Sequence, residues 1–319
     1  MPLTLRLDPW QPSYESALQV DEDEAFGTDV DPTVETSDWQ PIEPQFVERP
    51  KSIAFVDGVQ RVEYRVVGTD EGHTAYGALA SIAVGASIVS DGCNNLYPAA
   101  IGRILGLSDG VEFAPLCIPC GTATLDFMPE PVGESGVAAP IQAVQNARRD
   151  AESRLGTQLV EEGHEMVVVD GRLNWQPTRK TMVIGLIKTI HKRYLEDAQS
   201  AVLPLLASGT RTPIFRIARD RAVYSWYLRL ASSRPIDHAL AGIVRIETLD
   251  TIGIEAAVRL ADLTACYLPG FASSPIHDPR APQNLYPIGG LERQLRHNLG
   301  DQQWIRRNIE DHFAREVAR

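Results

Sequence analysis

The chain has 319 residues, of which 44% are hydrophobic and 23% are charged, and its formal net charge is −12. This composition excludes a collagen, a coiled coil and a wholly disordered chain. The acidity is concentrated near the N-terminus, because residues 1–50 carry twelve acids and two bases whereas residues 51–319 carry 30 and 28. The net charge therefore describes the first fifty residues and does not argue against a nucleic-acid partner for the rest.

Residues 1–50 are rich in proline and lack a sustained apolar period. We interpret them as an irregular acidic arm and residues 51–319 as one domain. Two roles for the arm stay open. It is either a solvated linker or an interaction arm that Trp10, Trp39 and Phe46 hold against a surface.

Several classes of protein are not expected. There is no run of about 20 apolar residues that would predict a membrane helix. The first ten residues lack the apolar segment of a secretory signal, so we expect a cytoplasmic protein. The sequence also has no phosphate loop, dinucleotide fingerprint, nucleophile elbow or zincin motif. Cys117 and Cys120 have a metal-like spacing, but without a second ligand pair we assign them no role.

Apolar runs bounded by turn residues predict a mixed β-sheet, and runs with steps of three and four predict helices. The expected strands are residues 53–58, 62–67, 77–90, 111–119, 165–171, 181–190, 213–218, 222–230 and 241–249. The expected helices are residues 140–162, 252–267 and 288–318, with a proline-rich loop at 269–287. The fold class is therefore α/β or α+β around a mixed sheet.

Two Asp-Gly steps each end an apolar strand, Asp57-Gly58 and Asp170-Gly171. A carboxylate at a strand end has a rigid backbone, and the glycine after it leaves room for a substrate or metal. Two such strands side by side would bring their carboxylates to one edge of the sheet, where Mg²⁺ or Mn²⁺ would find oxygen ligands. The alternative is that each step is an ordinary turn.

Glu152 is a candidate third carboxylate. It lies at the flank of the apolar stripe in the helix that leads into the strand of Asp170. A glutamate at this position could reach over the edge of the sheet. The alternative is a surface glutamate beside the stripe.

Five short segments in this order resemble motifs of the NurA nuclease family. They are IAFVDGVQRVE, RRDAESRL, VVVDGRL, GLIKTI and NLYPIGGLERQLRH, and together they extend over residues 50–315. The resemblance implies an RNase H-like fold, Mn²⁺-dependent cleavage of DNA (with Mg²⁺ as a possible substitute), and 5′-to-3′ exonuclease activity with single-strand endonuclease activity. It also implies a homodimer that works with the hexameric ATPase HerA in DNA-end resection and repair.

By this resemblance, Asp57, Glu152 and Asp170 would be the catalytic carboxylates that bind metal, in a two-metal-type mechanism. Lys188 would stabilise charge on a phosphate, although it could instead be an ordinary solvent-facing lysine. Tyr286 would fall at the family's tyrosine and contact a phosphate or a base.

This sequence departs from the family pattern at two positions. A histidine is expected eight residues after the tyrosine, but that position holds Gln294, and the nearest histidine is His297. Since 294 and 297 lie three apart in the predicted helix, His297 could substitute. Val59 also replaces the family's serine after the first Asp-Gly.

Basic residues that could hold DNA are scattered through the chain. They are Arg148, Arg149, Arg179, Lys180, His191, Lys192, Arg193, Arg211, Arg216, Arg219, Arg221, Arg229, Arg306 and Arg307. Trp226, Tyr227 and Trp304 are more typical of a core than of base stacking. Two other functions remain open: a non-catalytic subunit that binds DNA or an ATPase, and a metal-dependent enzyme that acts on a different phosphate ester.

Overall fold

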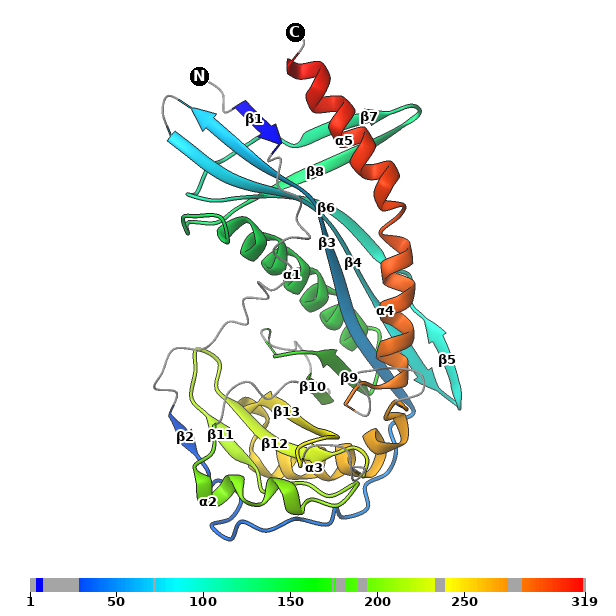
Figure 1. Ribbon diagram of the computed structural model, residues 1–319. Coiled ribbons are helices and arrows are strands. Elements are labelled where there is room, and N and C mark those ends of the chain that lie inside the picture. The colour runs from blue at the N-terminus through cyan, green and yellow to red at the C-terminus, as the bar shows by residue number, and fades with distance from the viewer. Residues whose placement is uncertain are drawn as a thin grey trace.

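The computed structural model describes residues 4–7, 29–70, 73–173, 175, 182–188, 194–232, 239–274 and 283–317. Within these residues, 13 strands form one mixed sheet that has helices on both faces (Figure 1). The expected fold class, α/β with a mixed sheet flanked by helices, is confirmed. None of the described helices combines the length and the apolar character needed to cross a membrane.

The strands follow the chain from β1 to β13. They are β1 (Thr4–Leu7), β2 (Val30–Asp31), β3 (Ser52–Asp70), β4 (His73–Ser90), β5 (Cys93–Leu96), β6 (Ala100–Leu107), β7 (Leu116–Cys120), β8 (Ala123–Pro131), β9 (Met166–Asp170), β10 (Met182–Ile187), β11 (Phe215–Ile217), β12 (Val223–Arg229) and β13 (Ile243–Leu249). Their order across the sheet is β2-β11-β12-β13-β10-β9-β3-β4-β6-β8-β7, with β1 paired to β3 and β5 paired to β4.

The centre of the sheet combines antiparallel and parallel pairing. Strands β3, β4 and β6 form an antiparallel meander. On the other side of β3, strand β9 pairs with it in parallel, and β10 pairs in parallel with β9. The described helices are α1 (Ala139–Glu161), α2 (Asp197–Ser200), α3 (Ile254–Tyr267), α4 (Tyr286–Asn298) and α5 (Gln302–Val317).

Alternate residues of β3 face two different helical layers. Ile53 and Phe55 belong to a buried cluster that contains residues of α3 and the first turn of α4. Ala54 and Val56 pack instead with Leu159 and other residues from the end of α1. The period of two along a strand thus places α1 on one face of the sheet and α3 with α4 on the other (Figure 1).

Two predicted strands, residues 53–58 and 62–67, are a single strand in the structure. Strand β4 pairs with β3 along its whole length, from Ser52–Ser90 to Asp70–His73, with one irregularity between Val62 and Tyr64. The step Asp57-Gly58 therefore lies within a strand, and the prediction that it ends one is wrong.

Other elements also differ from the expected ones. Residues 111–115 are not a strand, and β7 begins at Leu116. Strands β6 and β8 were not expected, because two glycines interrupt the first and two prolines lie near the end of the second. The expected C-terminal helix is two helices, α4 and α5, separated near Gly300, whose φ of 86° ends a right-handed helix.

Residues 29–50 have little regular structure but contact the domain through a buried ion pair. The carboxylate of Glu35 accepts hydrogen bonds from both terminal nitrogens of Arg211, at 2.9 and 2.8 Å, and from the backbone N–H of Ile214 at 2.7 Å. Arg211 is 1% exposed, and its Nε donates to Asp262 of α3 at 2.8 Å. Trp39 packs against Phe215, whereas Phe46 is 85% exposed.

Replacing Arg211 by alanine should strongly destabilise the protein, because it leaves the buried Asp262 and the partly buried Glu35 without their cation. We expect a loss of about 3–5 kcal/mol in the free energy of unfolding, measured by urea denaturation. Arg216 is the matched control. It pairs with Asp250, but its side chain is 39% exposed, so Arg216→Ala should cost less than about 1 kcal/mol. Equal losses in the two variants would contradict this prediction.

Candidate functional site

Two aspartates lie next to each other where β9 ends. Val56 of β3 pairs with Val169 of β9 in the parallel ladder, and Asp57 and Asp170 are the next residues of the two strands. Since laterally aligned residues of a sheet project from the same face, both carboxylates point to the side of α4. The structure therefore brings together the two aspartates that the sequence singles out.

The sheet opens immediately beyond these aspartates. Strand β9 stops at Asp170, but β3 continues for 13 residues past Asp57. Among the described strands, none pairs with this edge of β3 between Asp57 and Val66, where β1 begins to pair. Side chains satisfy the backbone there instead. The N–H of Gly58 donates to Asp57 Oδ1 at 2.8 Å, and Arg148 donates to the carbonyl oxygen of Gly58 at 3.3 Å.

Glu152 reaches this edge from the opposite face of the sheet. It lies on α1, is 5% exposed, and forms an ion pair with Arg148 one turn earlier in the helix. Gly58 makes the approach possible, because a Cβ at that position would overlap Glu152 Oε1 and lie 3.1 Å from Arg148 Cγ. The glycine thus lets a carboxylate from the α1 face approach the free edge of β3 directly beside Asp57.

Burial and repulsion raise the pKa values of two of these carboxyl groups. For Asp57, which is 6% exposed, burial has the largest effect, followed by the charges of Asp170 and Glu152, and the pKa rises well above its usual range although Lys188 opposes the shift. For Glu152, burial raises the pKa to about 7 against the opposing charge of Arg148, and Asp170 adds to the rise. Asp57 and Glu152 therefore do not ionise easily unless a cation comes close.

Lys188 supplies part of the missing positive charge. It follows directly after β10, and its Nζ lies 2.6 Å from Asp170 Oδ2. The lysine side chain is 14% exposed, so it does not point freely into solvent. Asp170 and Glu152 are thus each paired with a cation of the same chain, Lys188 and Arg148.

The structure does not bring Tyr286 and His297 next to Asp57. Both are on α4, which packs over the Asp57 face of the sheet. The residues of α4 beside the site are Leu291 and Leu295, which contact the space above Gly85, the cross-strand partner of Asp57. Tyr286 is 48% exposed at the start of the helix, and His297 is exposed in its last turn. A catalytic role for either residue stays a prediction.

The three carboxylates suit a divalent metal by their chemistry. In the part of the chain that the structure describes, no three His, Cys, Asp or Glu side chains are grouped closely enough to enclose an ion. The donors are nevertheless all carboxylate oxygens, and burial together with the negative charge of neighbouring carboxylates raises the pKa values of Asp57 and Glu152. Oxygen-rich, negatively charged sites of this kind fit hard cations such as Mg²⁺ and Mn²⁺.

Two arginines that we expected to face DNA are buried. Arg211 is held by Glu35 and Asp262, as described above. Arg229 is 3% exposed and donates to the carbonyl oxygens of Ala241 and Ala239 at 2.6 and 2.9 Å. Both side chains are structural, and the prediction that they bind DNA is wrong.

Two of the three aromatic residues expected in the core are buried. Trp226 and Tyr227 are core residues, at 0% and 2% exposure, whereas Trp304 is 46% exposed and was wrongly expected to be buried. Six further residues lie outside the described part of the chain: Trp10, Arg179, Lys180, His191, Lys192 and Arg193.

Arg148 was expected only as a DNA contact, but it connects α1 to the edge of β3. Its spacing of four residues from Glu152 is the sequence signal for that ion pair.

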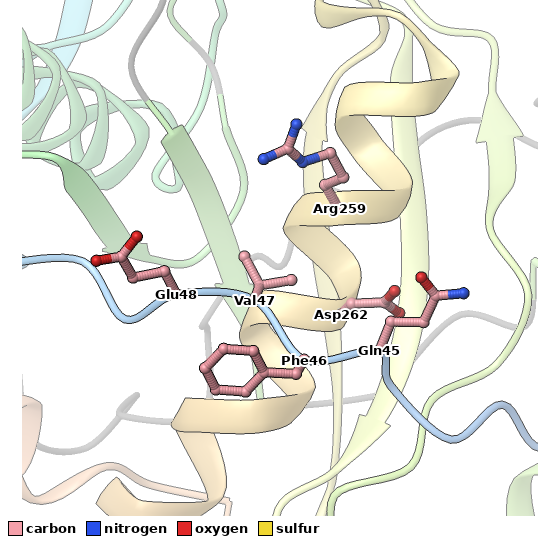
Figure 2. Close-up of a pocket in the computed structure, with 6 residues that line it drawn as sticks. All are labelled: Gln45, Phe46, Val47, Glu48, Arg259 and Asp262. Atoms are coloured by element: carbon pink, nitrogen blue, oxygen red, sulfur yellow. The ribbon is translucent and has the colours of Figure 1, made fainter.

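A pocket of about 330 Å³ lies elsewhere in the molecule (Figure 2). Its lining residues are Gln45, Phe46, Val47, Glu48, Arg259 and Asp262. They come from the N-terminal segment and from α3, and none of them is a predicted site residue. This pocket therefore does not add to the carboxylate site.

Comparisons with known proteins give limited support. No family model matches the chain, and no curated protein matches it. Among solved structures, the chain is similar to the crystal structure of the NurA nuclease from Sulfolobus solfataricus, with a TM-score of 0.46 and 10% sequence identity over 82% of this chain and 84% of that one. Similarity at this level establishes neither membership of a family nor a function.

The raised pKa of Glu152 predicts how stability depends on pH. The folded state keeps a proton on Glu152 that the unfolded chain has already lost, so the metal-free protein should become less stable as the pH rises from 4.5 to about 7. The contribution of this group is on the order of 3 kcal/mol. Urea denaturation across this range should show a smaller decrease for Glu152→Gln.

The control for this experiment is Glu161→Gln, which changes an exposed glutamate of the same helix. It should keep the pH dependence of the wild type. If Glu152→Gln and the wild type lose stability equally between these pH values, the predicted shift is wrong.

Proposed function

We propose that this protein is a metal-dependent DNA nuclease and that Asp57, Glu152 and Asp170 form its metal site. The observation that carries the proposal is that three carboxylates lie near the open edge of β3, from both faces of the sheet, close enough for their charges to affect one another's pKa values. Fully buried structural carboxylates are usually paired with cations inside the core. Among the described residues, no cation forms an ion pair with Asp57, which lies beside a strand edge that no described strand covers.

The residues of the chain have distinct roles in this proposal. Asp57, Glu152 and Asp170 would hold Mn²⁺ or Mg²⁺. Bound divalent cations, two of them in a two-metal mechanism, would activate water and stabilise the charge that develops on the phosphate. Lys188 and Arg148 contact Asp170 and Glu152 and hold these side chains at the edge of the sheet, and their charge there favours the approach of a phosphate.

The finer details of the proposal rest on the ordered sequence motifs. We propose that the enzyme is a 5′-to-3′ exonuclease that also cleaves single strands internally, and that it prefers Mn²⁺. It would form a homodimer and act with a HerA-type hexameric ATPase in DNA-end resection. The catalytic contributions of Tyr286 and His297 have the same basis. Co-purification with a HerA-type ATPase encoded beside this protein is the direct test of the partnership.

A second candidate function is a non-catalytic subunit that binds DNA or an ATPase. Two observations favour it. Arg148 and Lys188 already neutralise two of the three carboxylates, and α4 presents leucines rather than Tyr286 or His297 beside Asp57. A protein of this kind would bind DNA or its partner without cutting, with or without metal.

The nuclease proposal predicts Mn²⁺-dependent cleavage of labelled single- or double-stranded DNA. Asp57→Asn and Asp170→Asn should each lower the rate by more than about 100-fold, since loss of a ligand exceeds the effect of losing a residue that only supports one. Asp150→Asn, an exposed position on α1, is the matched control and should keep wild-type activity. Mononucleotide esters assayed in parallel separate DNA cleavage from action on a smaller phosphate ester.

Two results would contradict this assignment. Strong metal-dependent cleavage by both aspartate variants would show that the site lies elsewhere. DNA binding by a folded wild-type protein without cleavage under any metal would favour the non-catalytic subunit.

A further inference from the structure

The three residues that follow Asp170 are fixed at several points. The N–H of Gly171 donates to the carbonyl oxygen of Leu186 at 2.8 Å. The N–H of Leu173 donates to Glu247 Oε1 at 2.7 Å, and Arg219 donates to the carbonyl oxygen of Leu173 at 3.3 Å. Gly171 has a φ of 113°, which only glycine adopts without strain. The backbone immediately after a candidate metal ligand is therefore held rigidly.

Glu247 is the centre of this arrangement. It lies on β13, has no exposed surface, and accepts hydrogen bonds from Arg219 at 2.7 Å and from Arg245 at 2.8 Å as well as from Leu173. Although burial opposes ionisation, the two arginines and the N–H of Leu173 lower the pKa of Glu247. The carboxylate is thus ionised and fully engaged, so it is not a spare metal ligand.

Gly185 makes room for the same turn. It lies on β10 opposite Glu247 in the antiparallel ladder with β13. A Cβ at this position would be 2.6 Å from the carbonyl oxygen of Gly171, 3.0 Å from the nitrogen of Leu173 and 3.2 Å from Cγ of Glu247. Any side chain there would force the turn away from β10 and would move the end of β9.

We propose that Glu247 is a positioning residue for the metal site and acts through the turn at residues 171–173. It fixes the direction in which Asp170 leaves β9, and Gly185 lets the turn approach closely enough for the Leu173 hydrogen bond. Lys188 depends on the same geometry, because the N–H of Gly171 is bonded to the end of β10 that carries it. This inference rests on the proposed function, since Asp170 has to be a ligand for its position to matter.

The test is the affinity for Mn²⁺, measured without substrate by the electron paramagnetic resonance signal of the free ion. Gly185→Ala adds one methyl group, changes no charge and removes no ligand, yet it should weaken Mn²⁺ binding by about 10- to 100-fold, as the loss of support for a ligand does elsewhere. Glu247→Gln should weaken it similarly. Arg219→Gln, at a partly exposed side chain, is the variant to use if Glu247→Gln does not fold.

A glycine of equal crowding serves as the control. Gly77 lies in β4, and a Cβ there would be 2.6 Å from Val66 Cγ2 and 3.3 Å from the carbonyl oxygen of Gly106. Gly77→Ala should therefore lose stability in urea but keep its affinity for Mn²⁺. This comparison separates a local effect on the site from general strain in the sheet.

A double-mutant cycle tests the route through Asp170. In the background of Asp170→Asn, the change Gly185→Ala should cause little further loss of Mn²⁺ affinity, since the ligand that it positions is already gone. Additive losses would overturn the proposed route. Wild-type affinity in Gly185→Ala and Glu247→Gln would overturn the positioning role and leave the proposed function intact. A folded wild type that binds no Mn²⁺ would overturn both.

Discussion

The early end of β9 is the constraint on which the candidate site depends. Because β9 stops at Asp170 while β3 continues, the backbone of Gly58 loses its neighbouring strand, and buried backbone groups need hydrogen-bond partners. Asp57 and Arg148 provide them. Through the same gap, Glu152 of α1 approaches the edge of β3 from one face of the sheet, and Asp57 lies at that edge on the other face. If β9 were two residues longer, the ladder would close and Glu152 could not reach the aspartates.

The second constraint is charge. A closed sheet edge would tolerate neither three carboxylates nor the two cations that accompany them, because desolvating ions is costly unless they are paired. At the open edge, Asp170 and Glu152 are paired with Lys188 and Arg148, whereas no ion pair to Asp57 is found in the described parts of the chain. The carboxylates can therefore gather only where the sheet is open. Their excess negative charge favours a cation as the ligand at this edge.

Local patterns predicted much of the fold and the positions of the main carboxylates. The apolar runs identified β9, β10, β12 and β13, and the helical period identified α1 and α3. The step Asp57-Gly58 was interpreted as the end of a strand, because Asp-Gly usually marks a turn. In the structure the glycine serves close approach by Glu152, and only the neighbouring strand ends. Which strand ends at a given residue depends on lateral pairing, and that information is not local.

The same limit explains the errors on arginines and on the network around Glu247. By sequence, Arg229 is an ordinary strand arginine and Arg211 lies just before an expected strand, and their burial depends on partners ten or more residues away, at Glu35, Asp262 and the carbonyl oxygens near residue 240. Glu247 was not singled out because a glutamate between a β-branched run and a threonine has no distinctive spacing. Its function depends on the turn after β9, which is 74 residues away in the chain.

The contact between Glu35 and Arg211 also affects the order in which the protein can form during synthesis. These residues are 176 positions apart, and the third member of the ion network, Asp262, is synthesised later still. The N-terminal segment therefore leaves the ribosome long before its partners exist, and the half of the sheet that contains β11 to β13 cannot assemble around Arg211 until α3 has been made. Contacts of such long sequence separation slow folding. The acidic, proline-rich composition of the segment is compatible with this interval, because a chain of that kind stays soluble while it has nothing to pack against.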